Sequence, residues 1–255
     1  MNLSLTTIED IPLIHSGDDL SGIIAEKTLA QKIVPQNGDI FVVAQKIVSK
    51  AEGRMVNLTT VHPSIEALHL AEVTGKDARM VELVLQESNC VVRTAPNTLI
   101  VEHKCGFISA NAGIDHSNVH GEWGNEADWV LLLPKDPDHS AAVIRQELEE
   151  RFQCRLGVLI IDSHGRAWRN GTVGTSIGLS GLPGLVDLRG TEDLFGFHLK
   201  ITQVAAADEL AAGASLLMGQ AAEKTPVIFV RGFPYELREG ELKELIRAKE
   251  HDLFR

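Results

Sequence analysis

The run from Leu156 to Ile161 constrains the fold most, because this continuous apolar stretch ends abruptly at an acidic residue, Asp162. Such runs are typical of strands buried on both faces of a sheet. A second run, Asp39 to Ala44, follows the Asn37-Gly38 turn and predicts another buried strand. The basic segment Gln45 to Arg54 begins where that strand ends, at the edge where open α/β sheets bind ligands.

Two short polar stretches follow β-rich apolar runs, and each carries a carboxylate next to small hydroxyl or amide residues. They are Asn111 to Asn118, which contains Asp115, and Asp162 to Arg166. A hard divalent cation such as Mg²⁺ or Mn²⁺ takes one or two protein carboxylates and fills its other positions with water and phosphate oxygens. The alternative is that both aspartates only cap turns by accepting hydrogen bonds from nearby backbone N–H groups. Spacing alone leaves both interpretations open.

The composition and charge of the chain exclude several classes of protein. Its 255 residues are 44% hydrophobic, enough for the core of one large domain or two modest ones. Lys and Arg number 24 against 35 Asp and Glu, a formal net charge of −11 that argues against a general nucleic-acid surface. Without a membrane-length apolar stretch or a signal peptide, the protein is expected to be cytoplasmic. Three cysteines without CxxC spacing support neither a disulfide framework nor a zinc site.

Apolar periodicity predicts helices and strands along the whole chain. Helices are expected over Leu20 to Ala30, Pro63 to Thr74, Asp77 to Glu87, Pro137 to Phe152, Ala205 to Met218 and Glu239 to Arg255. Further strands are expected over Cys90 to Thr94, Leu99 to Lys104, Phe107 to Ala110, Lys200 to Gln203 and Pro226 to Gly232. The change from helices to strands near residue 88 indicates a domain boundary. Residues 165–196 hold eight of the 22 glycines, so their backbone is expected to turn sharply or approach another group closely.

Four sequence blocks follow one another in an order that resembles one enzyme family. The blocks are Val48-Ser49-Lys50-Ala51-Glu52-Gly53-Arg54, Asn111-Ala112-Gly113-Ile114-Asp115, Asp162-Ser163-His164-Gly165-Arg166 and Leu216-Leu217-Met218-Gly219-Gln220. With them the chain resembles the coenzyme F420-0:L-glutamate ligases, the γ-glutamyl ligases of deazaflavin biosynthesis, from about Ile11 to Gly232. The resemblance implies a GTP-dependent ligase that joins L-glutamate to the lactyl carboxylate of coenzyme F420-0, or of its dehydro form. Such a ligase is then expected to add further γ-linked glutamates.

The same resemblance implies a fold and a set of partners. Members have a two-domain, mixed-sheet α+β fold, form intertwined homodimers, and need Mg²⁺ or Mn²⁺ and often K⁺. Here we expect a nucleotide-binding αβ domain over residues 1–87 plus 197–255, and a metal-binding and dimerisation domain over residues 88–196. No nucleic acid or membrane is expected as a partner. Some relatives carry a C-terminal nitroreductase-like domain, whose activity is expected to be absent because the sequence stops at Arg255.

Positions that match the family's motifs are expected to form the site. The resemblance implies metal ligands at Asp115, Asp162, Ser163 and Gln220. It implies nucleotide contacts at Ile11, Pro12, Leu13, Ile14, Gln45, Lys46, Lys50, Asn118, Met218, Gly219, Gln220, Ala221, Ala222, Glu223, Lys224 and Thr225. Ser163 stands where relatives can have Thr, whereas Gln220 stands where some have a carboxylate and offers only a neutral oxygen. Lys50 is expected to sit on a phosphate, which gives it a catalytic role together with Asp115 and Asp162.

The reaction itself requires activation, because a carboxylate and an amine do not form an amide at neutral pH. We hypothesise that the substrate carboxylate attacks the γ-phosphate of GTP, and that the glutamate amine then displaces the acyl phosphate. Positioning and charge stabilisation would supply the catalysis, with Lys46 or Arg54 helping to hold anionic substrate. Arg166 and Arg169 are candidates for the glutamate α-carboxylate, and Trp168 for stacking on a ring. Two alternatives stay open: a metal-dependent nucleotide phosphohydrolase, and a regulatory module that binds GTP without turnover.

Overall fold

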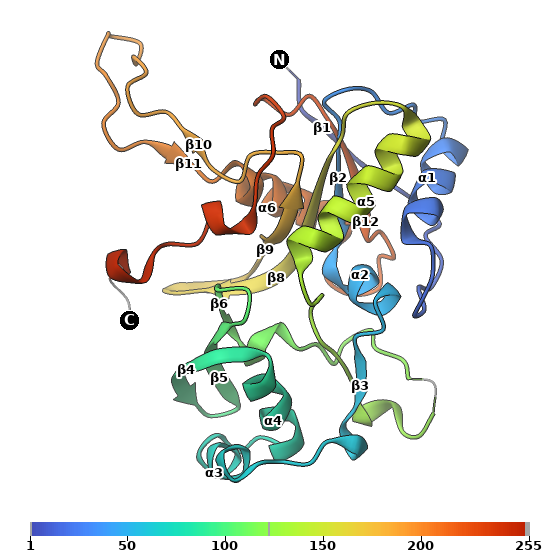
Figure 1. Cartoon of the computed structure of the whole chain (residues 1–255), viewed down its shortest axis with the longest axis vertical. Coiled ribbons are helices and arrows are strands. Elements are labelled where there is room, and N and C mark those ends of the chain that lie inside the picture. The colour runs from blue at the N-terminus through green and yellow to red at the C-terminus, as the bar shows by residue number, and fades with distance from the viewer. Residues whose placement is uncertain (1, 122, 253–255) are drawn as a thin grey trace.

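The computed structural model describes residues 2–121 and 123–252, and a five-stranded sheet lies at its centre (Figure 1). The strands are β1 (Ser4–Thr7), β2 (Ile40–Ala44), β8 (Gly157–Arg166), β9 (Arg169–Ser180) and β12 (Val227–Arg231), in the spatial order β1-β12-β2-β8-β9. Strands β2 and β8 are parallel, and the other pairs are antiparallel. Both buried strands predicted from apolar runs are therefore confirmed, and they are neighbours. Ala44 lies opposite Ile161, so the residues that follow emerge at one edge.

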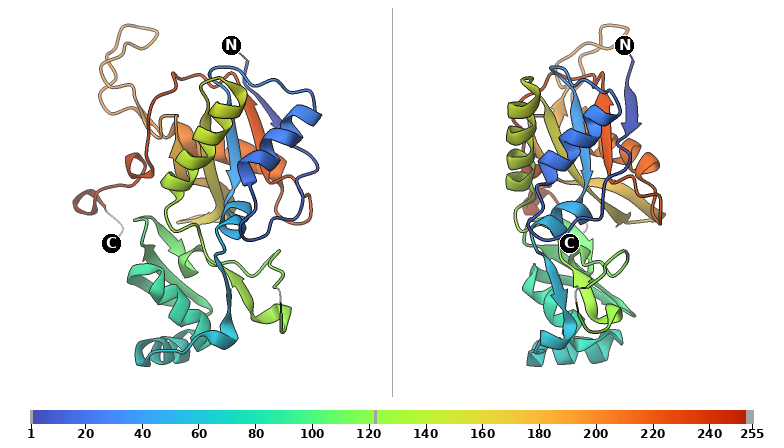
Figure 2. Two further views of the ribbon diagram at one scale, coloured as in Figure 1. Left: turned by 45° about the vertical axis from the view of Figure 1, so that its right-hand side comes forward. Right: turned by 90° about the vertical axis from the view of Figure 1, so that its right-hand side faces the viewer.

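Helices cover both faces of this sheet (Figure 2). Helices α1 (Leu20–Ala30) and α5 (Pro137–Phe152) pack on one face, and α6 (Ala206–Met218) packs on the other. Within β2, Phe41 and Val43 join the core under α1 and α5, while Ile40 and Val42 join the core under α6. This alternation is the period of two of a strand, and it explains why the run is apolar without a break.

The chain between α2 (Gln45–Ala51) and α5 forms a smaller region, seen in the lower half of Figure 1. It contains the pair β3 (Met55–Asn57) and β7 (Trp129–Leu131) and the three-stranded antiparallel sheet β4 (Ser88–Ala95), β5 (Thr98–His103) and β6 (Ile108–Ala110). Helices α3 (Ile65–Thr74) and α4 (Ala78–Gln86) cover these strands. Two apolar clusters hold the region together, one around Val81, Leu99 and Val101 and another around Leu83 and Val130.

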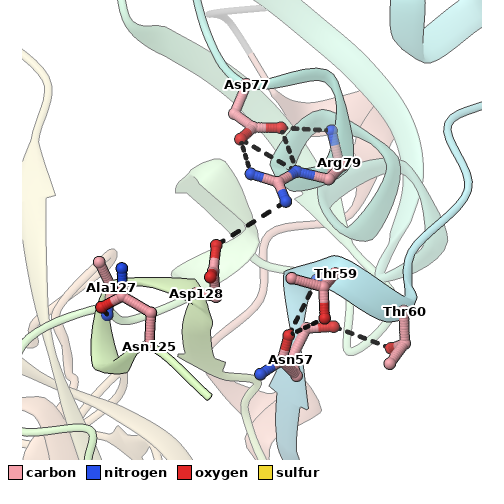
Figure 3. Close-up of polar contacts among 8 residues, drawn as sticks. All are labelled: Asn57, Thr59, Thr60, Asp77, Arg79, Asn125, Ala127 and Asp128. Carbon is pink, nitrogen blue, oxygen red and sulfur yellow. Dashed lines mark hydrogen bonds and ion pairs between the residues drawn. The ribbon is translucent and has the colours of Figure 1, made fainter.

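Polar contacts fix the turns of the smaller region (Figure 3). The side-chain oxygen of Asn57 accepts hydrogen bonds from the backbone N–H of Thr59 at 2.9 Å and from its hydroxyl at 2.6 Å. Arg79 pairs with Asp77 at 2.6 Å and reaches Asp128 at 3.7 Å, which links α4 to the segment before β7. Exposed ion pairs contribute little stability each, so the apolar clusters remain the main support of this region.

Strand pairing crosses the domain boundaries expected from the sequence. Residues 157–180, expected in the domain of residues 88–196, form β8 and β9 of the main sheet, and α3 and α4, expected in the domain of residues 1–87 plus 197–255, pack against β5. The order of elements along a chain does not reveal a parallel pair made by distant segments, such as β2 with β8. The mixed α+β fold is found as predicted. The two-domain arrangement and its nucleotide-binding and metal-binding roles stay predictions.

The helix expected over Glu239 to Arg255 is wrong for the described part of that segment. The tail up to Asp252 forms only two short 3₁₀ turns, η4 (Leu242–Glu244) and η5 (Lys249–His251), and residues 253–255 lie outside the described residues. Leu242 is buried in the core under α6, and its backbone N–H donates to the Asp138 carboxylate at 2.9 Å. These tertiary contacts fix the path of the tail and override its helical periodicity.

Two glycines of β9 let helices approach both faces of the strand. A Cβ at Gly174 would overlap the backbone oxygen of Ala211 in α6, and a Cβ at Gly178 would overlap the backbone of Pro137 at the start of α5. The close approach expected for the glycine-rich segment is therefore confirmed at these positions. None of the described helices combines the length and the apolar character needed to cross a membrane, and the cytoplasmic location stays a prediction.

Replacing Gly178 with Ala should destabilise the protein, because the added methyl group forces the first turn of α5 away from β9. We expect a loss of about 1–3 kcal/mol in the free energy of unfolding, measured by urea denaturation. Gly213→Ala in α6 is the matched control, because a Cβ there meets only Leu5 at 3.7 Å. The control should gain up to about 1 kcal/mol from helix propensity. Equal effects of the two substitutions would contradict the packing argument.

The smaller region meets the main sheet through a stack of three rings. Phe107 lies parallel to His103 with centroids 4.9 Å apart, and its centroid is 5.3 Å from that of His164 in β8. Nδ1 of His103 accepts a hydrogen bond from the backbone N–H of Cys105 at 3.0 Å. Burial, together with the charges of His164, Arg54 and Lys104, lowers the pKa of His103 to about 4. His103 is therefore neutral at pH 7.

Acid should destabilise the protein through His103. In the unfolded chain this histidine takes up a proton below about pH 6.5, whereas the folded state resists protonation down to about pH 4. Its contribution to stability is therefore present above pH 6.5 and is lost as the pH falls to about 4, by about 3 kcal/mol. We expect His103→Asn, whose amide oxygen can still accept the Cys105 N–H, to flatten this part of the profile. The measurement is the free energy of unfolding in urea between pH 7 and 4.5. An equally steep loss of this free energy in the variant would refute the role assigned to His103.

Candidate active site

An open groove of about 2610 Å³ lies where β2 and β8 end, between the main sheet and the smaller region. It is lined by the residues that the sequence predicted for the site, which are Ile11, Pro12, Leu13, Ile14, Gln45, Lys46, Lys50, Asp115, Asn118, Asp162, Ser163, Met218, Gly219, Gln220, Ala221, Ala222, Glu223, Lys224 and Thr225. Pockets for one drug-sized ligand have volumes of roughly 300–1,000 Å³. The groove therefore has room for more than one substrate at a time.

Asp115 is anchored beside the edge of the main sheet. Its backbone exchanges two 2.9 Å hydrogen bonds with Leu131 of β7. Its carboxylate oxygen Oδ2 accepts a 2.7 Å hydrogen bond from Nε2 of Gln45, and Nζ of Lys46 lies 3.4 Å from the same oxygen. Burial and the nearby charge of Asp162 raise the pKa of Asp115 to about 6, although Lys46 and Gln45 oppose the rise. The two carboxylates are thus close enough for the charge of Asp162 to disfavour ionisation of Asp115, even with Lys46 beside it.

Helix α2 presents two different faces because residues four apart share a side. On one face, the hydroxyl of Ser49 donates to Oε1 of the buried Gln45 at 2.9 Å, which directs the Gln45 amide nitrogen to Asp115. On the other face, Lys46 and Lys50 extend along the groove. The structure thus shows Gln45 orienting Asp115, and the nucleotide contact expected for Gln45 stays a prediction.

The two lysines hold the segment after Asp115 against α2. Lys46 donates to the carbonyl of Ser117 at 3.0 Å and to its hydroxyl at 2.8 Å, and Lys50 donates to the carbonyl of Asn118 at 2.8 Å. The amide of Asn118 donates in turn to the carbonyl of Ala221 at 3.1 Å, so two predicted nucleotide segments are in direct contact. Partial burial and the charge of Lys46 lower the pKa of Lys50. This wall of the groove is locally positive and suits an anion.

The loop that follows α6 closes the same wall. Gly219 has φ +71°, and a Cβ there would overlap the Glu223 side chain, whose carboxylate accepts the N–H of Ala221 at 2.8 Å. The hydroxyl of Thr225 donates to the carbonyls of Leu217 and Met218 at 3.0 and 3.1 Å. The loop is therefore held by its own hydrogen bonds before any ligand binds.

Asp162 lies within β8, which runs on to Arg166, so the strand does not end where the sequence predicted. Strand residues two apart share a face. Consistent with this, Nε2 of His164 lies 3.0 Å from Oδ2 of Asp162. His164 also contacts Phe107, so it connects the Asp162 carboxylate to the ring stack.

The predicted metal site has few protein ligands. Within residues 2–121 and 123–252 no group of three or more His, Cys, Asp and Glu side chains is arranged to hold a metal ion. Asp115 and Asp162 supply two carboxylates. The charge of Asp162 raises the pKa of Asp115, and a bound cation would offset this repulsion. Mg²⁺ is commonly bound by one or two carboxylates, with water and phosphate oxygens in the other positions. The residues present fit this mode and do not fit an all-protein cage.

Two other expectations have different outcomes. Arg54, expected to help hold substrate, does not line the groove; its guanidinium bonds Glu87 at 2.7 Å and the Leu133 carbonyl at 2.9 Å. The charge of Arg54 is therefore used in a structural ion pair with Glu87. Trp168, the candidate for ring stacking, does line the groove, with its side chain exposed and φ +56°. Trp123 and Trp129 instead pack edge to face with centroids 5.2 Å apart.

Comparison with known proteins identifies the family. Residues 9–232 match the family of F420-0:gamma-glutamyl ligases. A protein of Methanothermobacter thermautotrophicus named coenzyme F420:L-glutamate ligase is 44% identical over 257 residues, with both chains covered completely. Proteins of the same name from Methanopyrus kandleri and Archaeoglobus fulgidus are 43% and 40% identical, covering 97% and 100% of this chain and 97% of each relative. The resemblance seen in the four sequence blocks is confirmed, and the chain belongs to the F420-0:gamma-glutamyl ligase family of enzymes.

Proposed function

We propose that this protein joins L-glutamate to coenzyme F420-0, or to its dehydro form, at the expense of GTP, and then adds further γ-linked glutamates. Relatives that match its whole length carry the name coenzyme F420:L-glutamate ligase. The observation that carries the proposal is the convergence of separate sequence blocks: residues 11–14, 45–50, 115–118, 162–163 and 218–225 all line one groove. Its volume suits a reaction that brings three substrates together.

Different residues of the groove bind the nucleotide and the metal ion. Lys46 and Lys50 bind the phosphates of GTP, and the loop of residues 218–225 binds the rest of the nucleotide together with residues 11–14. Asp115 and Asp162 hold Mg²⁺ or Mn²⁺, with neutral oxygens from Ser163 and Gln220. When bound, such an ion neutralises charge on phosphate oxygens. A K⁺ ion belongs to the same proposal, without assigned ligands.

Two displacements make the amide bond. An oxygen of the substrate carboxylate bonds to the γ-phosphorus, and the bond from that phosphorus to the GDP oxygen breaks. The neutral amine of glutamate then bonds to the acyl carbon, inorganic phosphate leaves with the transferred oxygen, and the nitrogen loses a proton. No protein side chain forms a covalent bond, so the chain acts by holding the reactants in line and by neutralising charge.

The proposal is tested by incubating the protein with coenzyme F420-0, GTP, Mn²⁺ and L-glutamate, and counting glutamyl residues by mass spectrometry. We expect glutamylated products whose formation requires GTP and stops on chelation of the metal. Asp115→Asn and Asp162→Asn should each lower the rate by at least about 100-fold. Glu66→Gln, on the first turn of α3 and outside the groove, is the matched control. Phosphate release without glutamate would instead identify a phosphohydrolase, and GTP binding without turnover would identify a regulatory module.

We also propose that the protein is a homodimer. The hairpin of β10 (Val186–Asp187) and β11 (Gln203–Val204) projects from the main body (Figure 1). Between these strands Leu194, Phe195 and Ile201 are 96%, 94% and 87% exposed. Large apolar side chains gathered on one projecting element typically form an interface, and in most soluble oligomers the partner is another copy of the chain.

Light scattering after size-exclusion chromatography should give the mass of a dimer. The double substitution Leu194→Glu and Phe195→Glu places charge on the projecting β10–β11 hairpin and should shift the protein to monomer. Val34→Glu replaces an apolar residue that is 66% exposed but lies outside this hairpin, and it should leave the dimer intact. A monomeric wild-type protein, or a double variant that stays dimeric, would contradict the proposal.

A further inference from the structure

The groove continues past Asp162 into a section that the proposed roles do not use. One wall of this section is the sheet of β4, β5 and β6, through Val92, Arg93, Ile100 and Ile108, and the other is the end of β8 with Arg166. The two walls meet where Phe107, the residue before β6, contacts His164 of β8. Arg93 and Arg166 come from different sheets and both line this groove, together with apolar side chains of β4, β5 and β6.

A β-bulge brings Arg93 into the groove. Val91 of β4 is opposite Val101 of β5, whereas Arg93 is opposite Ile100, so Val92 is an extra residue on β4. Without it, strand alternation would place Arg93 on the face of Val91, which packs against the apolar cluster under α3. With it, Arg93 shares the groove face with Ile100, its neighbour on β5, and with Ala110, which lies opposite Ile100 on β6. Bulges often re-aim a side chain next to an active site.

Arg166 lines the groove from the end of β8, where the pairing with β9 is irregular: Gly165 is opposite Thr172, whereas Arg166 is opposite Arg169. Asp162 and His164 share one face of β8, and the whole segment from Asp162 to Trp168 lines the groove. The paired residue across the hairpin is Arg169, so two like charges face each other where the strands end. Directly opposed like charges are unfavourable in an antiparallel pair unless an anion lies near them.

Neither Arg93 nor Arg166 has an ionic partner among the described residues. Several other arginines of the chain form ion pairs: Arg54 pairs with Glu87, Arg231 with Asp39 and Arg238 with Glu244. In a chain with a formal net charge of −11, two unpaired guanidinium groups that line one section of a groove make it locally positive.

We propose that Arg93 and Arg166 bind the two carboxylates of the amino-acid substrate, L-glutamate, an inference that rests on the proposed ligase function. The amine of glutamate must stay free to attack the acyl group, so recognition falls on the carboxylates. A guanidinium binds a carboxylate in a bidentate, planar manner. Two guanidinium groups that each bind one carboxylate select a substrate that has two carboxylates at a matching separation. The pair lies beyond Asp162, whereas the lysines proposed for the nucleotide phosphates lie on α2.

The experiment measures steady-state kinetics with saturating GTP, Mn²⁺ and coenzyme F420-0 while L-glutamate is varied. Arg93→Gln and Arg166→Gln should each raise the KM for glutamate about 10- to 100-fold and leave the KM for GTP unchanged. Arg93→Lys and Arg166→Lys should recover part of the loss, because charge remains without the bidentate geometry. Arg155→Gln is the control, since Arg155 lies outside the groove.

A second readout tests contact with each carboxylate. Wild-type protein should strongly prefer glutamate over glutamine, which lacks the side-chain carboxylate, and over isoglutamine, which lacks the α-carboxylate. One arginine variant should lose preference against glutamine and the other against isoglutamine, a pattern that general loss of structure does not produce. Unchanged KM values for glutamate, or increases confined to GTP or coenzyme F420-0, would overturn the inference. If the wild-type protein makes no glutamylated product at all, the proposed function itself fails.

Discussion

The parallel pairing of β2 with β8 is the constraint on which the candidate site depends. Ala44 lies opposite Ile161, so β2 passes into α2 at the point where β8 extends beyond its parallel partner through Asp162. The strands can pair only because their side chains are apolar on both faces and helices cover both faces. Burial of these two runs therefore brings Gln45, Lys46 and Asp162 into one groove, although more than a third of the chain separates them.

Charge is distributed along the groove in a way that matches its proposed substrates. Lys46, Lys50, Arg93 and Arg166 line the groove together with Asp115 and Asp162, and the charge of Asp162 helps to raise the pKa of Asp115. Anionic groups favour the cationic side chains, and a cation favours the two carboxylates. The raised pKa of Asp115 shows that the protein holds this carboxylate against an unfavourable environment. Perturbed groups of this kind gather at functional sites.

The amino-acid sequence predicts local features well and long-range ones poorly. The helices at Leu20–Ala30 and Pro137–Phe152 were expected from periodicity, and both begin after an aspartate cap, Asp19 and Asp136, as a short-range rule requires. The bulge at Val92 could not be predicted, because register depends on the partner strand, and so Arg93 was not considered for the site. The tail after Glu239 was misjudged for the same reason, since contacts with Asp138 and the core under α6 fix its path.

The groove also depends on how firmly its two walls are joined. One wall belongs to the main sheet and the other to the smaller region, which has its own apolar clusters. The stack of His103, Phe107 and His164 sets their separation next to Asp162. A substrate that contacts Arg93 on one wall and Arg166 on the other binds only the joined arrangement, and so it stabilises that arrangement by mass action. The buried ring of His103 thus belongs to the contact that holds the two walls of the groove together.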